Sequence, residues 1–343
     1  MNTLYVLSEG SYLRREGEAV LVDRKRVDGG LPTLRVPIHM LDGILCFGRV
    51  SASPSAMALC AERGVALSFL SPGGRLLARV DAPGSGSVVV RRAQVRAADD
   101  AARTITIARA VVAGKIQSQR QNLLRSARDA RSDADAETLR RTANLLLQSV
   151  EALQHAGMLD VVRGYEGEST RLYFEHIALM TPDVPKPLRF VKRSRRPPKD
   201  AANALLSFLY GVLTNDCASA LAAVGLDPSI GFLHADRPGR PSLALDLVEE
   251  FRAPLADRLA ITLINRKQVT PDAFSTRTGG AVEMTEAARR TVVAAYQERK
   301  NERREHPYLG QQAPIGRFLF IQARIMARHL RGDIDHYVPV QFK

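Results

Sequence analysis

The stretch GFLHADRPGRPSLALDLVEEFR, residues 231–252, decides how the larger part of this chain is interpreted. It presents His234, passes through a Pro/Arg loop and then begins a helix that mixes apolar with acidic residues. Asp246 lies three positions before Glu249 and four before Glu250, so these carboxylates share one helix face. Because apolar residues flank them, at least one carboxylate should be half-buried and need a cation or strong donors to offset its desolvation.

A second acidic candidate lies upstream, in VVRGYEGESTRLYFEHI, residues 161–177. Apolar residues after Glu166 predict a buried helix that follows it. Glu166 could complete a metal shell with His234 and Glu249, and oxygen ligands with one nitrogen suit Mg²⁺ or Mn²⁺ better than Zn²⁺. The alternatives are a histidine that is only hydrogen-bonded in its turn, acids on an exposed helix face, and Glu166 as a helix N-cap or first-turn acid.

The pattern predicts a multi-domain α+β protein. Residues 1–90 contain short runs of alternating or β-branched character separated by turn residues, which predicts a small β-rich N-terminal domain. Within it, residues 53–64 predict a helix capped by Ser53 and stopped at Gly64. Residues 91–343 predict a larger, all-α domain, because apolar residues there recur with helical spacing. The expected helical segments are 92–129, 134–157, 167–180, 200–224, 242–263, 283–304 and 314–331.

The charge of the chain points to a polyanionic partner. Its 49 Lys and Arg against 36 Asp and Glu give a net charge of +13, with a pI near 10.1. Nucleic acid is the first expectation and an anionic membrane the second, with a merely soluble basic protein as the alternative. A proline-flanked basic loop, residues 189–200, suits a phosphate backbone, although a solvated charge run would have the same composition. The candidate phosphate-binding side chains are Arg193, Arg195, Arg196, Lys199, Arg237 and Arg240.

The remaining features predict a soluble cytoplasmic protein. The three cysteines are scattered through apolar contexts without a C-x-x-C pair, as expected of reduced core residues. The N-terminal residues lack the basic and apolar regions of a signal peptide. No uninterrupted apolar stretch approaches the ~18 residues that span a bilayer, so no membrane-spanning segment is expected and nucleic acid rather than a membrane remains the first expected partner.

Four segments in order resemble the CRISPR-associated spacer-acquisition integrase family, metal-dependent DNA nucleases of CRISPR adaptation. The resemblance covers essentially the whole chain, and the histidine loop and compact length are most similar to the subtype I-C form. The segments are GYEGESTRLYF (164–174), RRPPKDAANALLSFLYGVL (195–213), GLDPSIGFLHADRPGRPSLALDLVEEFR (225–252) and ITLINRKQV (261–269).

The resemblance implies a β-sandwich-like N-terminal dimerisation domain, a helical catalytic domain, and a homodimer that joins a small ferredoxin-like companion protein. It implies that Glu166, His234 and Glu249 are the catalytic metal ligands for Mg²⁺ or Mn²⁺, with Asp246 as a supporting acid. Double-stranded and branched DNA are the implied substrates.

The implied reaction is attack of a DNA 3′-hydroxyl on a phosphodiester, which inserts foreign DNA fragments, the spacers, into a CRISPR array as part of antiviral defence. Tyr165 and Tyr210 are candidates to stack on DNA or hydrogen-bond near it, and the alternative is a place in the core. A non-catalytic DNA-binding scaffold with a structural acidic cluster is the rival function. A small-molecule metallohydrolase would leave the basic charge unexplained.

Overall fold

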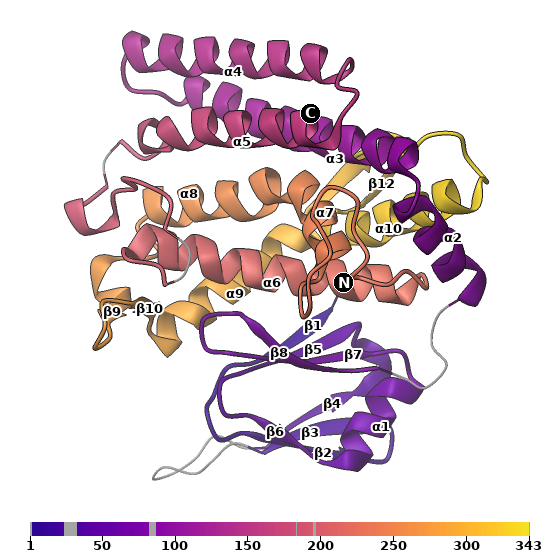
Figure 1. Ribbon diagram of the computed structural model, residues 1–343. Coiled ribbons are helices and arrows are strands. Elements are labelled where there is room, and N and C mark those ends of the chain that lie inside the picture. Colours follow the sequence, from indigo (N-terminus) through magenta and orange to yellow (C-terminus); the bar gives the residue numbers. More distant parts are fainter. Residues whose placement is uncertain (1, 24–32, 82–86, 183, 195–196, 343) are drawn as a thin grey trace.

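Figure 1 shows the computed structural model of the chain, in which residues 2–23, 33–81, 87–182, 184–194 and 197–342 are described. Strands make up most of the N-terminal part, and helices dominate from residue 88 onward. The predicted fold class, a small β-rich part followed by a larger helical one, is therefore confirmed. The helical part also contains two short antiparallel strand pairs, which the helical periodicity did not predict.

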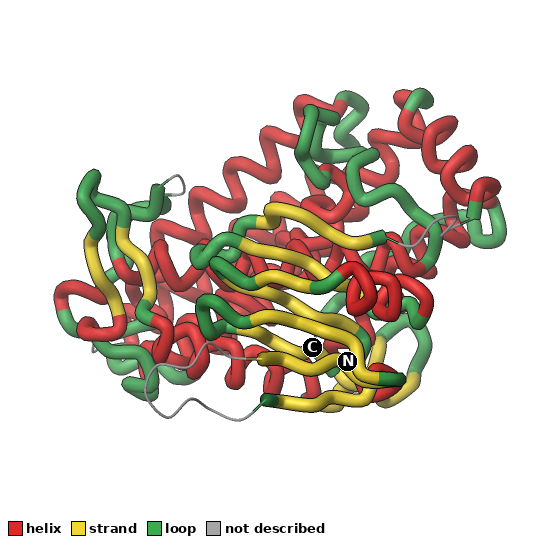
Figure 2. Tube along the Cα trace, turned by 90° about the horizontal axis from the view of Figure 1, so that it is seen from below, coloured by secondary structure: helices red, strands yellow, loops and turns green. Residues whose placement is uncertain are grey.

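Two four-stranded sheets form the N-terminal part, and Figure 2 shows their strands gathered on one side of the helices. Leu13, Val20, Ile44 and Leu67 belong to one buried cluster that draws on both sheets. The first sheet has the order β1-β5-β7-β8, with bounds Thr3–Val6, Gly43–Phe47, Ala66–Leu70 and Leu76–Val80. The second has the order β4-β3-β2-β6, with bounds Leu34–Pro37, Ala19–Asp23, Tyr12–Glu16 and Ser51–Ala52.

Helix α1 (Pro54–Glu62) begins and ends where its residues predict. The Ser53 hydroxyl accepts a hydrogen bond from the Ala56 amide, and proline occupies the first helical position. Gly64 follows the helix with a φ of +66°, a left-handed conformation that favours glycine. The N-terminal helix was thus predictable from its capping residues alone.

The larger part is built around α6 (Ala201–Ala223), which packs on α7 and α10. Among the described residues, α6 is the one helix long and apolar enough to cross a membrane by length and composition, and most of its apolar window is buried inside the fold. The other helices are α2 (Val88–Ala98), α3 (Ala101–Arg128), α4 (Asp133–Leu153), α5 (Leu159–Glu175), α7 (Ser242–Phe251), α8 (Arg258–Asn265), α9 (Glu286–Asn301) and α10 (Ile315–Arg331). The strand pairs are β9 (Phe274–Thr276) with β10 (Val282–Met284), and β11 (Arg303–His306) with β12 (Gln311–Pro314).

Short helical turns complete these elements. A π-helical turn joins α7 to α8, and Pro254 within it lacks the amide hydrogen that a regular α-helix would use there. The 3₁₀ turns are Ile38–Met40, Ile177–Met180, Lys186–Leu188 and Pro271–Ala273.

The first sheet and the helices share one hydrophobic core. Leu45 and Phe47 of β5 belong to the same buried cluster as the helices, and the Phe47 and Phe208 rings lie 5.4 Å apart. The turn between β7 and β8 touches α6 so closely that a Cβ at Gly211 would lie 2.3 Å from the Gly74 carbonyl oxygen. These contacts fix the first sheet directly on the central helix.

Candidate active site

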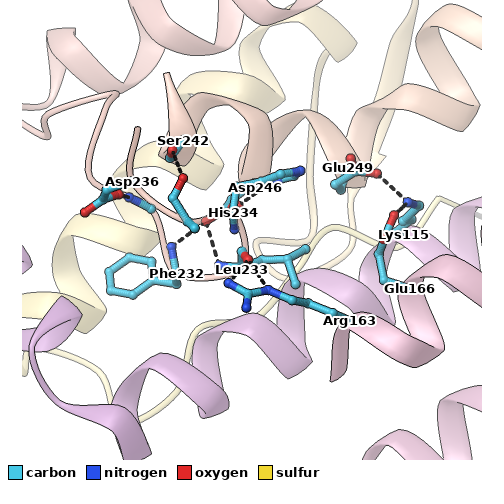
Figure 3. Close-up of polar contacts among 12 residues, drawn as sticks. Lys115, Arg163, Glu166, Phe232, Leu233, His234, Asp236, Ser242, Asp246 and Glu249 are labelled. Atoms are coloured by element: carbon cyan, nitrogen blue, oxygen red, sulfur yellow. Dashed lines mark hydrogen bonds and ion pairs between the residues drawn. The ribbon is translucent and has the colours of Figure 1, made fainter. Parts of the chain in front are cut away.

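The site residues come from three helices and one loop, and Figure 3 shows Glu166 and Glu249 meeting at Lys115 and His234 beside Asp246. α5 carries Glu166 and α7 carries Asp246 and Glu249, while His234 lies in the loop that precedes α7. Glu166 lies in the middle of α5, so the expectation that it precedes or caps a helix is wrong. The helix begins at Leu159, so Gly164 and Gly167, the glycines on either side of Glu166, lie inside it with that acid.

Asp246 fixes both the loop and the imidazole of His234. Its Oδ1 accepts from the His234 amide at 3.0 Å and lies 2.7 Å from His234 Nδ1. Its Oδ2 accepts from the amides of Phe232 and Leu233, at 2.7 and 3.1 Å. A carboxylate that faces Nδ1 favours the tautomer with hydrogen on that nitrogen, which leaves Nε2 with a free lone pair.

A second contact ties α5 to the same loop. The Arg163 guanidinium donates two hydrogen bonds to the carbonyl of Leu233, at 3.1 and 3.0 Å. The helix that carries Glu166 and the loop that carries His234 are therefore held together directly.

Lys115 of α3 connects the two glutamates. Its ammonium forms ion pairs with Glu166 Oε1 and with Glu249 Oε2, the latter at 2.9 Å, and only 2% of its side chain is exposed. The second oxygen of Glu249 pairs with Arg252 at 2.8 Å. Sequence reasoning missed both cations. A lone lysine in the apolar run that precedes Ile116 of α3 is the signal that could have found the first.

The neighbouring acids of α7 have opposite environments. Burial raises the pKa of Glu249, but the charges of Arg252 and Lys115 outweigh it and hold that pKa at about 2. Burial raises the pKa of Glu250 to about 7, although Tyr337, Gln322 and the Val340 amide donate hydrogen bonds to it. Glu249 is therefore ionised at neutral pH, whereas Glu250 fastens the C-terminal segment to α7.

Glu168, the other acid in the segment of Glu166, has a different environment. Both of its oxygens accept hydrogen bonds from the exposed Arg171, at 2.9 and 2.7 Å. Half of its side chain is exposed, at 51%. Of the two acids, Glu166 is the one that contacts the buried Lys115.

The donor atoms of this cluster suit a hard divalent cation. Among the described residues, no group of three or more His, Cys, Asp or Glu side chains is arranged to hold a metal ion. Glu249 Oε2 is nonetheless buried without a hydrogen bond, and its ion-pair partner is the lysine ammonium. The carboxylates of Glu166 and Glu249 and the Nε2 lone pair of His234 are donors of the kinds that Mg²⁺ or Mn²⁺ prefers.

Two of the predicted DNA-binding residues, Arg193 of the basic loop and Tyr210 of α6, contact each other. Arg193 donates to Asn203 Oδ1 at 2.6 Å, and its guanidinium carbon lies 5.1 Å from the ring centroid of Tyr210. Arg252 also stacks on Tyr210, whose hydroxyl donates to Asp257. These contacts support the alternative core role of Tyr210 and link the basic loop to the partner of Glu249.

The other predicted DNA-binding residues are more accessible or are not described. Lys199 and Arg237 are exposed, whereas Arg240 and Tyr165 are half-buried. Arg195 and Arg196 lie outside the described residues. Contact of any of these side chains with DNA stays a prediction.

Comparison with known proteins gives concordant results. A family model described as CRISPR associated protein Cas1 matches residues 4–298. The chain is 47% identical over 340 residues to "CRISPR-associated endonuclease Cas1 1" of Chlorobaculum tepidum. The matched region covers 99% of this chain and 98% of the relative.

Two solved structures share the fold. One, described as "Casposase bound to integration product", has a TM-score of 0.85 at 21% identity and covers 100% of this chain and 95% of its own. The other, a chain of a "Cas6-RT-Cas1--Cas2 complex", has a TM-score of 0.82 at 22% identity and covers 100% of this chain and 36% of its own.

Proposed function

The chain belongs to the CRISPR associated protein Cas1 family, and on that premise we propose that it is a divalent-metal-dependent DNA endonuclease and integrase. It would insert foreign DNA fragments into a CRISPR array as part of antiviral defence. The observation that carries the proposal is the meeting of Glu166 and Glu249 at Lys115, together with the contact between the helix of Glu166 and the loop in which Asp246 holds the imidazole of His234. The names of the endonuclease relative and of the casposase bound to an integration product support it.

Glu166, His234 and Glu249 would hold one Mg²⁺ or Mn²⁺. When bound, the ion polarises the scissile phosphate and stabilises charge on the entering or leaving oxygen. The protein's own contribution is positioning. Asp246 holds the imidazole with Nε2 free, and Arg252 holds one oxygen of Glu249 in place.

The reaction we propose is a transesterification. The oxygen of a DNA 3′-hydroxyl forms a new bond to phosphorus and gives up its proton. The old phosphorus–oxygen bond breaks, and the departing oxygen takes up a proton to become the hydroxyl of the released strand. Water in place of the 3′-hydroxyl would give hydrolysis of branched or nicked DNA at the same site.

The DNA would lie on basic side chains around this cluster. A net charge of +13 favours association with a polyanion, and each phosphate neutralised by Lys or Arg makes binding more salt-dependent. Arg237 is exposed in the loop that follows His234, so it can meet a phosphate beside the acidic cluster. Replacing Arg237 with Ala should lower the slope of log affinity against log salt by about one, and replacing Arg171, which pairs with Glu168 and Glu175, serves as the control.

The assembly we propose is a homodimer joined to a small ferredoxin-like companion protein. The shared fold with a chain of a complex that contains Cas2 supports a companion of this kind. A cytoplasmic location and membership of the subtype I-C form are parts of the same proposal.

The decisive experiment is a Mn²⁺ titration in a cleavage and integration assay on branched duplex DNA. Glu166→Gln and His234→Ala should abolish activity while leaving DNA affinity close to that of the unmodified protein. The matched control is Glu168→Gln, because this acid is two residues away, exposed and paired with Arg171. Activity retained in Glu166→Gln or His234→Ala would reject that residue as a ligand. Tight DNA binding without cleavage by the unmodified protein at any Mn²⁺ concentration would favour the non-catalytic scaffold.

A further inference from the structure

Lys115 has an unusual place for a lysine. It lies on α3, a helix that the family resemblance did not single out, and its side chain is almost completely buried. Within the described residues, every contact recorded for its ammonium goes to Glu166 or Glu249. A buried lysine is retained in a fold only where anions compensate it. Here those anions are the two carboxylates proposed to bind the metal.

The oxygens of Glu249 are both occupied by cations. Oε1 pairs with Arg252 and Oε2 with Lys115. A divalent ion that binds Glu249 must therefore displace one of these partners or share an oxygen with it. Sharing is unfavourable, since two cations that lie close together in a buried site repel each other strongly.

Lys115 is the cation that can leave. The Arg252 guanidinium is anchored by a second contact, because its central carbon lies 4.7 Å from the ring centroid of Tyr210. The Lys115 ammonium has no such second anchor among the described residues, and it ends a flexible four-carbon chain. The geometry thus distinguishes a fixed cation from an exchangeable one.

We propose that Lys115 is an internal counter-ion that holds Glu166 and Glu249 together in the metal-free protein and competes with the divalent cation for them. This inference rests on the proposed function, since it uses the same ligands. It adds that Lys115 keeps the metal-free site folded. It also adds that the exchange of the Lys115 ammonium for the divalent ion sets the metal affinity. Lys115 is a positioning residue and needs no contact with the DNA.

The test compares Lys115→Met with the unmodified protein in two measurements that do not involve catalysis. In the presence of a metal chelator, Lys115→Met should melt roughly 5 °C below the unmodified protein, because two neighbouring carboxylates lose their shared cation. In calorimetric titration, the variant should bind Mn²⁺ about tenfold more tightly or better. Saturating Mn²⁺ should then raise the melting temperature of the variant more than that of the unmodified protein.

Three further variants make the outcome specific. Lys186→Met removes the same charge from an exposed position and should change neither quantity. Lys115→Arg keeps the charge and should keep the weaker Mn²⁺ affinity. If Lys115→Met does not fold, Lys115→Gln replaces it, because the amide can still donate to the carboxylates. Mn²⁺ affinity in Lys115→Met equal to or below that of the unmodified protein overturns the inference.

Glu166→Gln separates this failure from a failure of the proposed function. If Glu166→Gln abolishes Mn²⁺ binding while Lys115→Met leaves it unchanged, the metal site stands and the competition does not. If Glu166→Gln binds Mn²⁺ as the unmodified protein does, the ligand set itself is wrong and the inference is rejected with it.

Discussion

Asp246→Asn tests the central arrangement of the site most directly, because this one side chain holds both the histidine and its loop. Each carboxylate oxygen accepts two hydrogen bonds, and the residue is fully buried. Asparagine has nearly the same shape, but one of its two terminal atoms becomes an amide nitrogen that cannot accept. Whichever way the amide is turned, two donors lose their acceptor.

The magnitude follows from these lost hydrogen bonds. A hydrogen bond to a charged group contributes roughly 1.5–3 kcal/mol, so two of them correspond to about 3 kcal/mol of unfolding free energy or more. If the nitrogen faces His234, it favours the other imidazole tautomer, with hydrogen on Nε2, the atom proposed to bind the metal. Loss of such an orienting partner typically lowers metal affinity or activity by about 10- to 100-fold.

The assay combines urea unfolding at neutral pH with Mn²⁺ titration calorimetry and cleavage of branched DNA. The control is Asp236→Asn in the same loop, since Asp236 is exposed and accepts a single long hydrogen bond, 3.2 Å, from the Gly231 amide. If Asp246→Asn has the same urea midpoint and the same Mn²⁺ affinity as the unmodified protein, the assigned role of Asp246 is refuted.

Three further predictions follow from other buried groups of the helical part. Burial raises the pKa of Glu250 from an ordinary 4.5 to about 7, so its contribution to stability is complete below about pH 4.5 and is lost as the pH rises through 7. Glu250→Gln should flatten this loss of stability in urea midpoints measured from about pH 5 to about pH 8. A pH dependence equal to that of the unmodified protein would contradict the raised pKa. Tyr210→Phe keeps the aromatic ring between its two guanidinium groups but removes the hydrogen bond to Asp257. The variant should lose about 1–3 kcal/mol of unfolding free energy and bind DNA as the unmodified protein does. Weaker DNA binding in a stable variant would instead support a direct contact of Tyr210 with DNA. Lys300→Met removes the ammonium that pairs with the buried Asp216 at 2.8 Å, so it should destabilise the fold by about 3–5 kcal/mol. Thermal unfolding measures this loss, and a melting temperature equal to that of the unmodified protein would disprove it.

The parts of the fold that depend on local signals were predictable from the sequence. Ser53 and Asp200 cap the helices that follow them, as serine and aspartate do when their side chains accept amide hydrogens of the first turn. The predicted helix over 92–129 is divided at Asp100, whose side chain caps α3. Periodicity missed this break because the apolar spacing continues on both sides of a tight junction.

The site was only partly predictable, because its geometry depends on long-range contacts. The acids of α7 follow from helical spacing, and the pairing of His234 with Asp246 follows from the short loop between them. Lys115 lies 51 residues before Glu166 in the chain, so no local spacing connects the two residues. Only the fold shows that the cation compensating these carboxylates is a lysine from α3.

The close approach of Gly74 to Gly211 has a practical consequence for anyone who wishes to divide this molecule. A cut near residue 90 would separate two architectures, yet it would strip Phe47 and Leu45 from the core that they share with the helices. A truncated helical fragment would therefore expose a hydrophobic surface along α6 and aggregate. Tags, fusions and crystallisation variants should leave the β7–β8 turn and Gly211 untouched, because one added methyl group at Gly211 would collide with the Gly74 carbonyl and push the sheet away from α6.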